Sequence, residues 1–167
     1  MDETLRAARD RLEQVTPLKK DCGKVCGAAC CRSLPGEETG MWLFPGEEEN
    51  YRDRPGWQVR RGALGWLLIC PGRCERDERP LSCRLFPLLP VLREAGVRVE
   101  MDQRARAVCP LAWQGKAGLD PAFVRAVAEA GELLAAKEEH AAFLRRLTEE
   151  QDAWRTLRDE WKGKDDD

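Results

Sequence analysis

Eight cysteines constrain this chain more than any other feature. Four lie within one stretch of ten residues, and the other four follow at wider intervals: Cys22, Cys26, Cys30, Cys31, Cys70, Cys74, Cys83 and Cys109. Residues 1–9 alternate charged and small side chains and lack the apolar core of a signal peptide, so we expect a cytoplasmic protein. Because a reducing compartment does not maintain disulfides, the cysteines indicate thiolate ligands of a metal centre. Alternatively, the cysteines could be small hydrophobic side chains buried in the core. Their clustering in the sequence argues against this interpretation.

The spacing of the first group predicts thiols that lie side by side. Cys22, Cys26 and Cys30 are four residues apart, so on a helix they would share one face with Cβ atoms about 5 to 6 Å apart. Zinc, with Zn–S bonds of about 2.3 Å, holds its sulfurs within roughly 3.8 Å of one another. The wider helical spacing fits the corners of an iron–sulfur cluster more easily. We therefore expect an iron–sulfur cluster or zinc, with iron–sulfur slightly favoured.

Adjacent cysteines add a second constraint on the metal centre. The side chains of Cys30 and Cys31 diverge on a helix and point to opposite faces on a strand, so they are poorly placed to bind one ion together. They could instead bridge two centres. Eight thiols suffice for two four-ligand sites, or for one cluster with cysteines to spare.

Hydrophobic periodicity predicts an α+β fold. Helical spacing of apolar residues indicates a helix over residues 3–15, and residues 63–69 read as a buried strand that ends at Cys70. The apolar runs 88–92 and 97–101 predict a β-hairpin. A helical pair, expected to be antiparallel, begins at Asp120. The predicted architecture is a small cysteine-rich metal-centred domain with a β-hairpin, flanked by an N-terminal helix and a C-terminal helical pair.

The same elements suggest how the chain is divided. We expect a cysteine-cluster domain with its N-terminal helix over residues 1–119, a helical extension packed on it over 120–162, and a disordered tail over 163–167. Within the extension, Trp154 and Trp161 are predicted to pack in the core.

Charge and hydropathy limit the partners. The chain has 28 Lys and Arg against 30 Asp and Glu, so no global field favours nucleic acid or an anionic membrane. The longest apolar run, residues 63–70, is far shorter than the roughly 20 residues that cross a bilayer. Besides the metal ion or cluster we expect no nucleic acid and no membrane as partner, and a protein partner is left open.

The cysteine pattern, followed by Arg-Pro-Leu-Ser-Cys-Arg-Leu-Phe-Pro at residues 79–87, closely resembles the YkgJ-like cysteine-cluster family. The resemblance covers about residues 20–112 and includes Leu-Phe-Pro-Gly-Glu at 43–47. Members are described as zinc- or iron-chelating domains, so the resemblance implies chelation without naming a reaction. Flagellin lysine methylases look like relatives that carry a similar cluster on larger chains. The first cysteine spacing here is wider than the form associated with the family motif.

Charged residues near the cysteines are the next candidates. Four thiolates around a divalent ion leave a charge of about −2 for nearby cations to offset. Arg84, next to Cys83 in the motif, is the residue we expect to contact the cofactor. Glu47 could be a ligand or a proton carrier, although a solvated loop carboxylate is favoured. The arginines closest in sequence to the cysteines are Arg32, Arg73, Arg76, Arg79 and Arg84.

No catalytic constellation is visible in the sequence. The single histidine, His140, is predicted to be exposed on a charged helix, which argues against a Cys–His nucleophile pair or a mixed Cys/His zinc site. The leading hypothesis is a metal-binding protein with a structural or redox role. The alternatives are a metal-dependent enzyme or enzyme component related to flagellin lysine methylases, and an interaction adaptor that uses the C-terminal helices.

Overall fold

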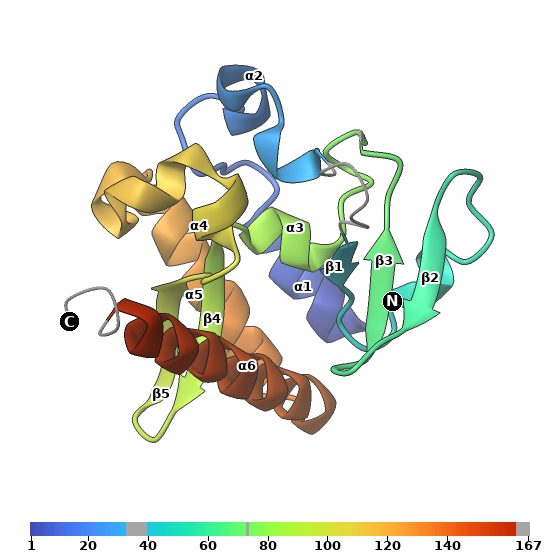
Figure 1. Cartoon of the computed structure of the whole chain (residues 1–167). Coiled ribbons are helices and arrows are strands. Elements are labelled where there is room, and N and C mark those ends of the chain that lie inside the picture. The colour runs from blue at the N-terminus through green and yellow to red at the C-terminus, as the bar shows by residue number, and fades with distance from the viewer. Residues whose placement is uncertain (33–39, 73, 163–167) are drawn as a thin grey trace.

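A computed structural model of the chain describes residues 1–32, 40–72 and 74–162 (Figure 1). Within these ranges the fold is α+β, as predicted, with two small antiparallel sheets and helices near both ends. The expected tail at 163–167 and Arg73 lie outside the described residues.

The predicted N-terminal and C-terminal helices are confirmed, although the N-terminal helix ends at Arg11 and not at residue 15. Helix α1 (Glu3–Arg11) begins after Asp2, whose Oδ1 accepts a hydrogen bond from the Leu5 backbone N–H at 2.8 Å. Helix α5 (Pro121–Ala135) begins after Asp120 in the same way, with proline at its first position. Helix α6 (Glu138–Lys162) follows after two residues and packs on α5. Within the described ranges, no helix is both long and apolar enough to cross a bilayer.

The predicted hairpin is also confirmed. Strand β4 (Leu88–Arg93) pairs antiparallel with β5 (Gly96–Met101), with Leu88 opposite Met101 and Arg93 opposite Gly96. Both α5 and α6 pack on this hairpin. Gly96 has φ of 103°, a conformation that favours glycine in the tight turn.

The second sheet has three short strands in the order β1-β3-β2. They are β1 (Gly40–Trp42), β2 (Gln58–Arg61) and β3 (Trp66–Ile69), and each pairing is antiparallel. The chain leaves β3 at Ile69, so Cys70 lies just beyond the strand end, as the sequence predicts.

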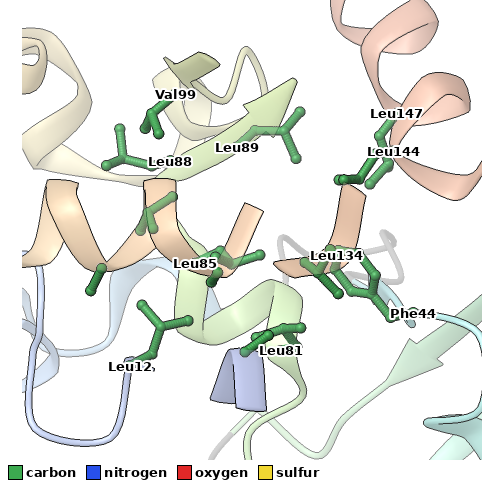
Figure 2. Packing of buried hydrophobic residues seen from close by; sticks show 14 of the residues in the cluster. Leu12, Phe44, Leu81, Leu85, Leu88, Leu89, Val99, Leu134, Leu144 and Leu147 are labelled. Atoms are coloured by element: carbon green, nitrogen blue, oxygen red, sulfur yellow. The ribbon is translucent and has the colours of Figure 1, made fainter. Parts of the chain in front are cut away.

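Shorter helices connect these parts. Helix α3 (Leu81–Leu85) precedes β4, and it buries Leu81 and Leu85 in the main core with residues of α1, α5, α6 and the hairpin. Figure 2 shows this core, with Leu85 near its centre. The remaining short helices are α2 (Cys22–Cys26), α4 (Ala105–Val108) and the 3-10 turns Ala29–Cys31, Glu48–Asn50, Pro110–Gln114 and Lys116–Gly118.

Two predictions about α6 are wrong. Trp154 and Trp161 are 50% and 69% exposed, because the C-terminal half of the helix keeps these side chains outside the core. His140 is fully buried and not exposed. The first turns of α6 lie beside the start of α1, where His140 Nε2 is 3.0 Å from Asp2 Oδ2.

Candidate metal centre

The eight cysteines come from several separate elements. Cys22 and Cys26 are the first and last residues of α2, and Cys30 and Cys31 lie in the 3-10 turn that follows. Figure 1 shows α2 above α3 and α4, on the side toward which the chain runs from the end of β3. Four further thiols come from after β3, from α3 and from the end of α4: Cys70, Cys74, Cys83 and Cys109.

The predicted helical face of Cys22, Cys26 and Cys30 is wrong for Cys30. Helix α2 ends at Gly27, which has φ of 64° and whose N–H bonds to the Gly23 carbonyl. Ala28 is also left-handed, with φ of 55°. The chain therefore changes direction before Cys30, and only Cys22 and Cys26 retain the spacing of one helical turn. Glycine after the second cysteine was the sequence signal for this helix end.

All eight thiols border two adjoining hollows. The first, which we call the apolar hollow, encloses about 770 Å³ including its part open to solvent. Its wall combines Met41, Trp57, Leu68 and Phe86 with six cysteines: Cys22, Cys30, Cys31, Cys70, Cys74 and Cys83. The second, which we call the arginine hollow, encloses about 510 Å³ and is bordered by three arginines and five cysteines: Arg76, Arg79, Arg84, Cys22, Cys26, Cys30, Cys83 and Cys109.

The thiols surround these hollows without converging on a point. Cys30 and Cys31 have sulfur atoms 3.9 Å apart, and all eight cysteines are free. Among the residues that the structure describes, no three Cys, His, Asp or Glu side chains lie close enough together to hold one metal ion. The arrangement thus brings the predicted ligands to the same two hollows but leaves them apart.

Burial favours the protonated form of four of the eight thiols. It raises the pKa of Cys22, Cys74, Cys83 and Cys109 above the usual value for a thiol. The hydrogen bond between Cys30 and Cys31 lowers the pKa of Cys31 and raises that of Cys30. A metal that binds thiolates here must therefore displace protons.

Arg79 is the cation most closely associated with the thiols. Burial favours its neutral form, but the thiol groups of Cys74 and Cys31 raise the pKa of Arg79 above its ordinary value. Its Nε is buried and has no hydrogen-bond partner within the described ranges. Because Arg79 borders both hollows, its charge can offset thiolates in either one.

Arg84, the arginine favoured by the sequence, borders only the arginine hollow of the two. Its side chain is nearly fully buried, and its Nη1 donates to Glu13 Oε2 at 2.6 Å. Its Nη2 donates to the Asp77 carbonyl at 3.2 Å. These bonds orient Arg84 toward protein acceptors, whereas Arg79 retains an unused donor. Sequence reasoning ranked Arg84 above Arg79, although both belong to the same Arg-Pro motif.

Glu47 lies outside both hollows, and the favoured prediction of a solvated loop carboxylate is wrong. It is fully buried, because the segment after β1 folds against α1 and α3. Its Oε1 accepts from the Leu81 N–H at 2.9 Å and lies 3.4 Å from Arg9 Nη1, while its Oε2 accepts from the Phe44 N–H at 3.0 Å. Burial raises the pKa of Glu47, against the effect of these donors. Glu47 therefore fastens the start of the helix that carries Cys83.

The donor chemistry of the hollows fits a metal that prefers sulfur. In the described part of the chain, neither hollow is bordered by a histidine or a carboxylate. Thiolates select zinc and iron–sulfur clusters, whereas magnesium and calcium require oxygen ligands. The guanidinium of Arg79, whose buried Nε has no hydrogen-bond partner in the described part of the chain, lies next to these thiols and matches the negative charge that such a centre would carry.

Comparison with known proteins adds no assignment. No protein-family model matches the chain, and searches of curated proteins and of solved structures return no significant match. The resemblance to the YkgJ-like family therefore remains an expectation that depends on the motifs of the sequence.

Proposed function

We propose that this chain is a metal-binding protein of the YkgJ-like type, which holds an iron–sulfur cluster or zinc through its cysteine thiolates. One observation carries the proposal: all eight cysteines border two adjoining hollows that also share the half-buried cation of Arg79. Cysteines that merely filled the core would have no need of a common cation. A cytoplasmic location is part of the proposal, because a reducing compartment keeps the thiols available.

In this proposal the protein supplies the metal centre with ligands and with a compensating positive charge. The cysteines around each hollow would be the ligands, and Arg79 would offset part of their negative charge. When bound, zinc supplies a structural cross-link and an iron–sulfur cluster supplies electron transfer. Iron–sulfur stays slightly favoured, since Cys22 and Cys26 keep the wide spacing of a helical turn.

A metal-dependent enzyme is the second candidate, and the apolar hollow is the observation that favours it. Met41, Trp57 and Leu68 line this hollow together with six cysteines. A substrate site needs such a concave apolar wall next to the reactive group. A centre that proves to be saturated by thiolates, with no exchangeable ligand by spectroscopy, would exclude this candidate.

An interaction adaptor is the third candidate. Trp154, Leu157 and Trp161 form an exposed apolar stripe on α6. Loss of a bound partner on replacement of Trp161 by Ala, with the fold unchanged, would support this role. Retention of all partners would exclude it.

Metal analysis of protein purified without oxygen tests the main proposal. We expect iron with acid-labile sulfide, giving a brown protein with broad visible absorbance, or zinc in a colourless protein. Protein with reduced thiols that contains neither metal, and takes up neither on reconstitution, would overturn the proposal. The variant Val25→Ala should contain the same metal as the unaltered protein, because Val25 lies between two cysteines on α2 but is 60% exposed and is not itself a ligand.

A further inference from the structure

The division of the thiols between the two hollows carries a further inference. We infer that the chain binds two metal centres, one at each hollow, and that Cys22, Cys30 and Cys83 are divided between them. This inference rests on the proposed metal binding and specifies the number of centres and their ligands. It is distinct from a single cluster surrounded by spare cysteines.

Five of the thiols belong to one hollow only. Cys31, Cys70 and Cys74 border the apolar hollow and not the arginine hollow. Cys26 and Cys109 border the arginine hollow and not the apolar one. Each group combines one cysteine of the segment 22–31 with cysteines from later in the chain, so the division does not follow from proximity in sequence.

The number of thiols matches two four-ligand centres. Zinc sites and iron–sulfur clusters each take about four thiolates. The apolar hollow has three thiols of its own and the arginine hollow has two, and three more border both. One shared thiol completes the first set and two complete the second, so all eight are used. This arrangement also explains how two adjacent cysteines can both be ligands without binding the same ion, because Cys31 borders one hollow while Cys30 borders both.

The surroundings of the two centres differ. Arg79 lies at both hollows, whereas Arg76 and Arg84 border only the arginine hollow of the two. Met41, Trp57 and Leu68 border only the apolar hollow of the two. The centre at the arginine hollow has more positive charge nearby, so the two centres should bind metal with unequal affinity.

Titration of the reduced, metal-free full chain with Co²⁺ tests the inference. Co²⁺ adopts zinc sites, and thiolate-to-metal absorbance reports its binding. We expect an end point of about two equivalents for the unaltered chain. The double variants Cys26→Ser with Cys109→Ser, and Cys70→Ser with Cys74→Ser, should each bind about one equivalent. Val25→Ala should behave as the unaltered chain.

The outcomes separate this inference from the proposed function. An end point of one equivalent in the unaltered chain overturns the two-centre division, as does loss of all binding, or of none, in a double variant that circular dichroism shows to be folded. If a double variant does not fold, the end point of the unaltered chain still decides the number of centres. Absence of Co²⁺ binding, together with absence of iron and zinc from isolated protein, overturns metal binding itself.

Discussion

Replacement of Glu47 by Gln should destabilise the protein strongly without changing its shape. The carboxylate receives backbone N–H groups from Phe44 and Leu81 and faces the guanidinium of Arg9. A glutamine can keep the bond from Leu81 only by turning its NH2 group toward the Phe44 N–H, which then has no acceptor. A hydrogen bond to a charged group contributes about 1.5 to 3 kcal/mol, and breaking a buried ion pair costs about 3 to 5 kcal/mol.

We therefore expect the free energy of unfolding to fall by about 3 to 5 kcal/mol. For a chain of 167 residues this corresponds to a decrease in melting temperature of roughly 6 to 20 °C. Urea unfolding at neutral pH, followed by circular dichroism, measures the change. Glu49→Gln is the matched control, since Glu49 is exposed in the adjacent 3-10 turn and should change stability by about 0.5 kcal/mol at most. A loss for Glu47→Gln no larger than this control would refute the role of Glu47 as an ionised buried acceptor.

Three further predictions concern the core, the pH dependence and the metal. Phe143→Ala should cost about 3 to 5 kcal/mol, because Phe143 is buried, whereas Trp154→Ala on the same helix should cost far less; equal losses in urea unfolding would contradict the core assignment. Arg93 donates to both carboxylate oxygens of Asp152 and holds its pKa below the usual range. This contribution to stability is present above the usual carboxyl pKa and is lost as the pH falls through the lowered value, so Asp152→Asn should reduce the loss of stability between about pH 5 and about pH 3. The reduction, measured by urea unfolding across this range, should stay below about 1 kcal/mol because the pair is partly exposed; an unchanged pH profile would argue against the pair. Cys83→Ala should lower metal content and melting temperature together, and a fall in only one of them would show that binding and folding are not coupled.

The local pattern of apolar residues was sufficient to predict the hairpin and the long helices. The hairpin and the three long helices each have their own apolar periodicity, and Asp2 and Asp120 cap helices from positions immediately before them. The helix at Cys22 was predicted too long, because its end depends on left-handed residues, and left-handed Ala28 is unusual for an alanine.

The burial of polar residues could not be predicted from the sequence. Glu47 is buried because its acceptors meet donors from Leu81 and Arg9, which are distant in the chain. His140 is likewise buried through a contact with Asp2 at the other end of the chain. The pairing of distant segments decides such cases, and periodicity carries no information about it. The grouping of thiols by hollow also depends on tertiary structure, since Cys30 and Cys31 are adjacent but border different sets of neighbours.

The segment of α2 and the following 3-10 turn carries four of the eight thiols but has no buried residue. Its detachment would remove none of its own side chains from the core, so the free energy of local opening should be well below that of global unfolding. Amide hydrogens of this segment should exchange with solvent faster than those of β4 and β5. For the proposed metal centres, release and uptake should then proceed through this opening, at rates set by the short segment while the hairpin and long helices stay folded.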